Sequence, residues 1–115
     1  MLRAALWTDK TGRFTACEVS GHAGYAEEGS DIVCSAVSVL CITCLNSLES
    51  VCGIRPAVSG GENGYLRFRL PREMTDDQRH DAQVILSTLR QGLGDLAQEY
   101  PKYVQFSIVN GGKQP

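Results

Sequence analysis

The pattern of apolar and polar positions along the chain predicts several strands. Residues 2–8 and 13–19 look like two strands joined by the polar turn around Asp9 to Gly12. The stretch VSGGENGYLRFRL (58–70) predicts a hairpin around an Asn63-Gly64 turn. The segment YVQFSIV (103–109) alternates toward one face and predicts a final strand.

Two longer segments have apolar residues spaced three and four apart, which is typical of helices. The first is expected over 32–52, with Ser30 or Asp31 as its N-cap and Gly53 at its end. Its apolar stripe consists of Cys34, Val37, Cys41, Cys44, Leu48 and Cys52. In the second, Thr75 and Gln78 form a capping box and Pro101 stops the helix. Two glycines, Gly92 and Gly94, should weaken its last turns.

The predicted order is therefore β-β-α-β-β-α-β. Two amphipathic helices and one sheet indicate a two-layer α+β fold, in which the sheet is mostly antiparallel or mixed. The sequence contains no long linker, so we expect residues 1–115 to form a single domain.

The charge balance argues against a general nucleic-acid binder. Eleven basic and thirteen acidic residues give a formal net charge of −2, whereas binding to a phosphate backbone needs a concentrated basic face. The basic residues Arg67, Arg69 and Arg72 lie close together in the sequence, and we interpret them as part of a solvated strand face. No direct contact with nucleic acid is expected.

No secretory signal is visible at the start, and the apolar run from Ile32 to Leu45 is expected to fall short of a membrane span. We therefore expect a cytoplasmic protein with no membrane contact. In that compartment the five cysteines should be reduced thiols.

The stretch GHAGYAEEGSDIVCSAVS (21–38) carries the candidate chemistry, because it holds His22 and Cys34 on either side of a loop. If the helix begins where expected, Cys34 lies in its first turn, where the helix dipole favours the thiolate. First-turn amides could hold an oxyanion, and a nearby imidazole would complete an activated nucleophile. Three glycines would give the loop its backbone freedom: Gly21, Gly24 and Gly29.

Two further residues are candidates for supporting roles. Asp31 could cap the helix or orient His22, and the two roles compete for one carboxylate. Ser38 lies one turn after Cys34 and could bond either the site or its own backbone. The spacing of Cys41 and Cys44 also suits half a zinc site or a redox pair, but no second paired motif accompanies it. No metal or cofactor is expected.

In this stretch the chain resembles the ribosomal-processing cysteine proteases, the Prp family. The resemblance rests on Gly21-His22, Gly24-Tyr25, Gly29, Asp31-Ile32-Val33-Cys34 and Ala36-Val37-Ser38. It departs from the common pattern at Ser35, where alanine is frequent. Length, element order and the Asn63-Gly64 hairpin agree more loosely.

The resemblance implies a homodimeric cysteine endopeptidase with His22 and Cys34 as its dyad, Asp31 and Ser38 as supporting residues, and Gly21 as a hinge. It implies a peptide partner as well, the N-terminal extension of large-subunit ribosomal protein twenty-seven, removed at a phenylalanine-rich site. From the residues alone, a non-catalytic ribosome-assembly or protein-interaction module with a structural thiol remains the alternative.

Overall fold

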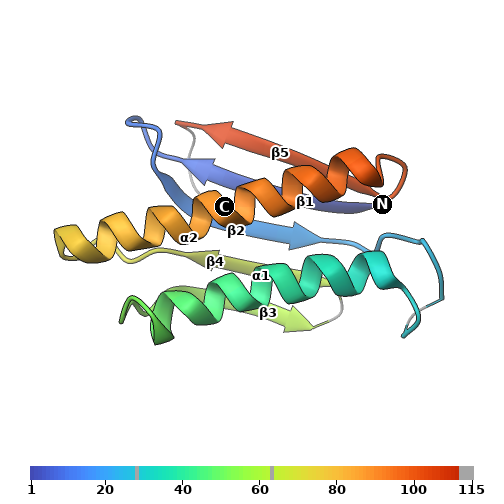
Figure 1. Cartoon of the computed structure of the whole chain (residues 1–115), viewed down its shortest axis with the longest axis horizontal. Coiled ribbons are helices and arrows are strands. Elements are labelled where there is room, and N and C mark those ends of the chain that lie inside the picture. Colours follow the sequence, from blue (N-terminus) through green and yellow to red (C-terminus); the bar gives the residue numbers. More distant parts are fainter. Residues whose placement is uncertain (28, 63, 112–115) are drawn as a thin grey trace.

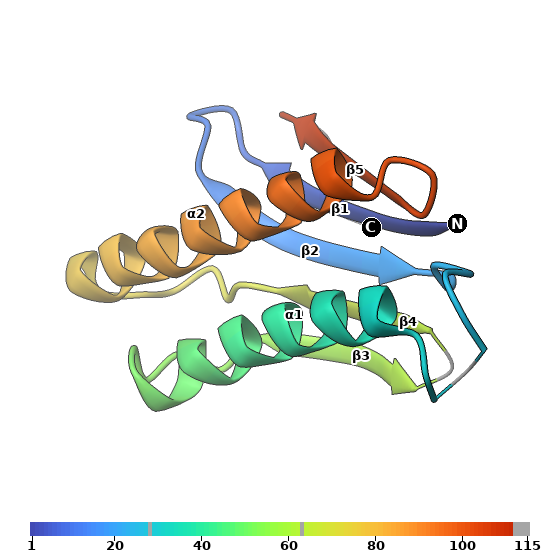
Figure 2. The ribbon, with the colours of Figure 1, turned by 45° about the vertical axis from the view of Figure 1, so that its right-hand side comes forward.

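A mixed sheet carries both helices on one of its faces (Figures 1 and 2). The computed structural model describes residues 1–27, 29–62 and 64–111, and these residues form five strands and two helices. The elements are β1 (Leu2–Thr8), β2 (Phe14–Ser20), α1 (Ile32–Ser50), β3 (Ala57–Glu62), β4 (Tyr65–Arg69), α2 (Asp76–Glu99) and β5 (Val104–Asn110). The predicted order and the two-layer α+β class are confirmed.

The strands lie in the order β3-β4-β2-β1-β5. Neighbouring strands are antiparallel except β1 and β5, which are parallel and lie at opposite ends of the chain in sequence. The sheet is therefore mixed, one of the two expected forms. Of the predicted Asn63-Gly64 turn, Asn63 lies outside the described residues.

Helix α1 begins at its cap and buries one stripe against the sheet. Of the two predicted N-cap candidates, Ser30 and Asp31, the structure has Asp31 as the N-cap. At the other end Gly53 adopts φ +66° and donates its N–H to the Glu49 carbonyl at 2.9 Å, as a closing glycine does. The buried residues of α1 are Val33, Val37, Cys41, Cys44 and Leu48. Cys34, expected on the stripe, is only partly buried.

Helix α2 has the predicted capping box between Thr75 and Gln78. Gly92 was expected only to weaken this helix, but it also lets α1 approach. A β-carbon added at Gly92 would lie 2.5 Å from a Leu40 methyl carbon, whereas one added at Gly94 would meet nothing within 4 Å. The close packing of α1 against α2 therefore explains why a glycine is needed at position 92, but it does not explain Gly94.

Judged by length and composition alone, α1 could cross a membrane, so the expectation that its apolar run falls short of a membrane span was wrong. The helix has 19 residues, because it continues past Leu45 to Ser50, and it is apolar enough to cross a membrane. A core helix passes the same test, and the buried stripe of α1 belongs to the hydrophobic core that it shares with α2 and the sheet.

Candidate active site

The loop between β2 and α1 folds back onto the start of α1 at the end of the sheet where β2 ends (Figure 1). Ala23 is 3% exposed, and its backbone N–H donates to Cys34 Sγ over 3.1 Å. His22 precedes this anchored residue directly. The structure therefore brings His22 and Cys34, which are twelve residues apart in sequence, into one site.

The Asp31 carboxylate holds both halves of this site together. Its Oδ1 accepts hydrogen bonds from the backbone amides of Val33 and Cys34, both at 3.0 Å. Its Oδ2 accepts from the amides of Tyr25 at 3.0 Å and Ala26 at 3.4 Å, within the loop. One buried carboxylate thus caps the helix and fixes the loop that follows His22.

The same hydrogen bonds set the protonation state of Asp31. The bond from the Cys34 amide, with smaller contributions from the Ala26 and Tyr25 amides, holds the pKa of Asp31 below its ordinary value, and burial opposes this only in part. The carboxylate is therefore ionised at neutral pH. Among the described residues it makes no hydrogen bond to His22, so the structure supports the capping role and only an indirect influence on His22.

This capping also bears on the predicted oxyanion site. The Val33 and Cys34 amides already donate to Asp31, so the expectation that the first-turn amides hold an oxyanion is not met for these two. The Ala23 N–H is the donor that points at the sulfur. An oxygen developing on a carbonyl bound to Sγ would form beside this group.

The His22 ring is exposed and lies against Gly64, just before β4. A β-carbon added at Gly64 would be 2.8 Å from ring atoms Cε1 and Nε2 and 2.8 Å from the Gly21 carbonyl oxygen. The Gly21 N–H also donates to the Gly64 carbonyl at 2.8 Å. Gly64 therefore forms the surface on which His22 rests, a role that its place in a hairpin motif did not reveal.

The three loop glycines all have positive φ angles, of +85° at Gly21, +72° at Gly24 and +90° at Gly29. Gly21 is also closely packed, because a β-carbon there would lie 2.5 Å from the Met1 carbonyl oxygen. In this structure Gly21 is a fixed point between two neighbouring segments, and its role as a hinge stays a prediction. No described atom lies within 4 Å of a β-carbon added at Gly24 or Gly29.

Two cavities flank His22 and Cys34. One of about 360 Å³ is lined by His22, Cys34 and Ser38 together with the loop residues Gly24, Ala26, Gly29 and Asp31. The other, about 220 Å³, is lined by the same three residues and by the β3–β4 hairpin, including Glu62 and Tyr65. No hydrogen bond joins His22 to Cys34 in the described part of the chain, and Ser38 is exposed. A peptide that occupied both cavities would pass over the sulfur and the imidazole.

An aromatic cluster anchors the middle of the loop. The Tyr25 ring packs edge-on against Tyr100 and Tyr103, with centroid separations of 5.8 Å and 5.1 Å. Tyr100 caps α2 and Tyr103 immediately precedes β5, so the loop is held to the segment that joins α2 to β5.

The remaining four cysteines are buried, and all five are free thiols. A hydrogen bond with Cys41, reinforced by burial, raises the pKa of Cys17 well above its ordinary value, and burial raises the pKa of Cys44 and Cys52. Among the described residues no group of three or more His, Cys, Asp or Glu side chains could hold a metal ion. Cys34 is partly exposed and lines both cavities with His22, whereas Cys41 is buried and lines only the second.

The chain is similar to known proteins over most of its length. The family model of cysteine protease Prp matches residues 1–105. The ribosomal processing cysteine protease Prp of Bacillus subtilis is 27% identical over 101 residues, covering 87% of this chain and 90% of that protein. The Staphylococcus aureus (strain Mu50) protein of the same name is 26% identical over 108 residues, covering 93% of this chain and 98% of that protein.

Solved structures with the same fold are similar over nearly the whole chain. One is a crystal structure of an essential ribosomal processing protease Prp from Staphylococcus aureus, in complex with a covalently linked product peptide. It superposes with a TM-score of 0.83 at 25% identity, and the match covers 94% of this chain and 99% of that one. A protein from Streptococcus mutans gives a TM-score of 0.78 at 29% identity, covering 96% and 95%. The chain belongs to the Prp family of cysteine proteases and is a hydrolase.

Proposed function

We propose that this protease removes the N-terminal extension of large-subunit ribosomal protein twenty-seven, with Cys34 as nucleophile and His22 as general base and acid. The observation that carries the catalytic assignment is the Ala23 N–H to Cys34 Sγ contact, because Ala23 directly follows His22, and His22 and Cys34 line the same two cavities. The ribosomal substrate class is supported by the names of the Bacillus and Staphylococcus relatives. The individual ribosomal protein is inferred from the family resemblance.

The proposed reaction is acyl transfer through the Cys34 thiol, with His22 as the group that accepts and donates the proton. His22 takes the proton of the Cys34 thiol, and the thiolate attacks the carbonyl carbon of the scissile peptide bond. The Ala23 N–H stabilises the oxyanion, and protonated His22 donates its proton to the leaving amine. Water activated by His22 then hydrolyses the thioester, which regenerates the thiol. Because the ring is exposed and rests on Gly64, a bound peptide can bring it onto the sulfur.

The loop is proposed to act as a lid during this reaction. The loop is anchored at Tyr25, through its ring contacts, and at Asp31, through its hydrogen bonds. Gly24, which precedes Tyr25, and Gly29, which lies between the two anchors, have no described atom within 4 Å of an added β-carbon. A peptide lying across both cavities would be covered by the loop, which would exclude water from the thioester until the amine has left. Ser38 lines both cavities and is proposed to contact the peptide or the dyad.

We further propose that residues 1–115 act as one cytoplasmic domain and assemble into a homodimer. Exposed apolar side chains on α1 and β3 support dimerisation, because Val39 is 66% exposed, Ile42 44% and Val58 50%. Sedimentation should give twice the 12.5 kDa mass of one chain. A mass of one chain at micromolar concentration would contradict the dimer without affecting the catalytic proposal.

A mass-spectrometric cleavage assay tests the function. Ribosomal protein twenty-seven with its extension is incubated with wild type, Cys34→Ala, His22→Ala and the matched control Cys52→Ala, which changes a buried cysteine outside both cavities. We expect one internal cut by wild type and by the control, and none by the other two. Binding of the intact protein without any cut would favour the non-catalytic assembly module instead.

A further inference from the structure

A large cavity lies at the end of the sheet opposite the active site. It has a volume of about 860 Å³ and shares no lining residue with the two active-site cavities. Its walls come from the β1–β2 turn, the link from α1 to β3, the end of β4 and the start of α2, which meet on the left in Figure 1. Helix α1 begins at the other end in the same view.

Arginines dominate this cavity. Five of its lining residues are arginines, contributed by four separate segments: Arg13, Arg55, Arg69, Arg72 and Arg79. The sequence alone indicated only that Arg67, Arg69 and Arg72 are close together and suggested a solvated face. The fold leaves Arg67 out of the cavity lining and adds three arginines that are distant in sequence. This concentration occurs in a chain whose net charge is −2.

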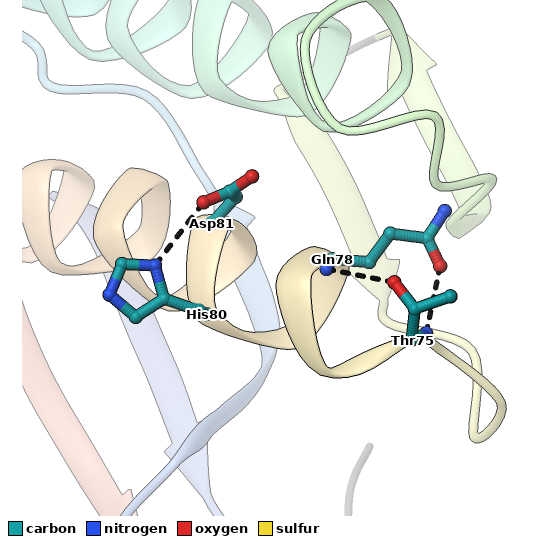
Figure 3. A network of polar contacts seen from close by, with 4 residues as sticks. All are labelled: Thr75, Gln78, His80 and Asp81. Atoms are coloured by element: carbon teal, nitrogen blue, oxygen red, sulfur yellow. Dashed lines mark hydrogen bonds and ion pairs between the residues drawn. The ribbon is translucent and has the colours of Figure 1, made fainter.

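The cavity has almost no acidic charge to balance these guanidinium groups. Among the described residues, Asp9 is the one acidic residue in its lining, and Asp9 Oδ1 already accepts hydrogen bonds from the Thr11 amide and hydroxyl and from the Arg13 amide. The ion pair found among residues 1–27, 29–62 and 64–111 joins His80 to Asp81 and involves none of the five arginines (Figure 3). Like charges gathered without partners repel one another, so an anion in the cavity would relieve a cost of the empty state.

The backbone around the cavity is held in place by hydrogen bonds between its segments. The Gln83 side chain both donates to the Phe14 carbonyl and accepts from the Phe14 amide, each at 2.8 Å, which joins α2 to β2. The capping box of Thr75 and Gln78 fixes the start of α2 (Figure 3), and Gln78 Nε2 also reaches the Cys52 and Gly53 carbonyls at 3.2 Å. The arginines therefore project from a pre-formed frame.

We propose that this cavity binds a compact anion carrying two or more adjacent phosphate groups. The planar guanidinium fork pairs two N–H groups with two phosphate oxygens, which makes arginine suited to this ligand. Five such groups exceed what one carboxylate could engage, whereas linked phosphates offer several oxygens and several charges. The volume is that of a small-molecule site, and apolar side chains of Phe14, Leu70 and Met74 line part of it.

Calorimetric titration with inorganic pyrophosphate tests the proposal, with sodium chloride adjusted to keep the ionic strength constant. The variant is Arg55→Gln/Arg72→Gln, which removes two cavity arginines. The control is Arg3→Gln/Arg90→Gln, which removes the same charge from two arginines outside the cavity. Thermal unfolding of all three proteins without ligand shows whether each is folded.

We expect saturable binding to wild type and to the control, and binding weaker by about tenfold or more in the cavity variant, because each lost guanidinium removes charge-assisted hydrogen bonds. No binding to wild type, or equal weakening in both double variants, would overturn the proposal. A short single-stranded RNA that binds more tightly than pyrophosphate through the same two arginines would also overturn it, in favour of a nucleic-acid surface. None of these outcomes bears on peptide cleavage, since the arginine-lined cavity and the two active-site cavities share no lining residue.

Discussion

Replacing Gly64 with alanine should displace the His22 ring and so uncouple it from Cys34 in the proposed dyad. The new β-carbon would lie 2.8 Å from two ring atoms and 2.8 Å from the Gly21 carbonyl oxygen, a distance that forces a shift. Gly64 also has a φ of +73°. Gly12 is the matched control, because its φ is +85° while a β-carbon there would meet nothing within 4 Å.

The two variants separate backbone strain from the contact with His22. The left-handed backbone costs alanine about 1 kcal/mol at either position. Overpacking typically adds about 1–3 kcal/mol, so Gly64→Ala should lower the free energy of unfolding by about 2–4 kcal/mol and Gly12→Ala by about 1 kcal/mol. A displacement of about 1 Å at a catalytic group can cost about 100-fold in rate.

Urea unfolding and kcat/KM for a peptide substrate measure these two effects. We expect Gly12→Ala to cleave at the wild-type rate and Gly64→Ala to lose about 100-fold under conditions where both are fully folded. A folded Gly64→Ala protein that cleaves as fast as Gly12→Ala would refute the idea that Gly64 positions the His22 ring.

Three further predictions follow from the same contacts. Iodoacetamide at neutral pH should modify Cys34 first and the four buried cysteines only after unfolding, as peptide mapping would show; equal labelling of all five would contradict the burial. Because the pKa of Asp31 is lowered in the folded state, the stability that its ionised form provides is fully present above its ordinary value of 3.8 and is lost as the pH falls through the lower, folded value. Chemical unfolding at pH 7 and pH 3 should therefore show a smaller loss for Asp31→Asn than for wild type, and equal losses would count against this linkage. Gly94→Ala should stabilise α2 by about 1 kcal/mol, while Gly92→Ala should gain less because its methyl group meets Leu40; equal shifts in thermal unfolding would contradict the close approach of the helices.

Local signals were sufficient to predict most elements of the fold. The Thr75-Gln78 capping box and the apolar spacing that follows it depend on residues within a few positions of one another, and both are confirmed. The β1–β5 pairing is different, because it joins the two ends of the chain. Strand alternation shows that a segment will pair but does not identify its partner, so the sequence left open whether the sheet was mixed.

The same limit applies to the candidate site. The glycine-rich loop and the helix start indicated that His22 and Cys34 could meet, and the Ala23 contact with the sulfur now shows that the two halves come together. The support that Gly64 gives to His22 depends on pairing between β2 and β4, where Ser20 lies opposite Tyr65. No local pattern carries that information. Nor could spacing decide how Asp31 divides its four hydrogen bonds between the helix and the loop.

The most direct test of the central claim is to detect the thioester on Cys34. The protease and a peptide spanning the cleavage site are mixed, quenched in acid within milliseconds to seconds, and measured by intact mass and peptide mapping. We predict a transient adduct on Cys34 equal to the N-terminal fragment less one water, no adduct in Cys34→Ala, and no cleavage by that variant. Continued cleavage by Cys34→Ala, or an adduct on another cysteine with Cys34 unmodified, would contradict the assignment of Cys34 as the nucleophile.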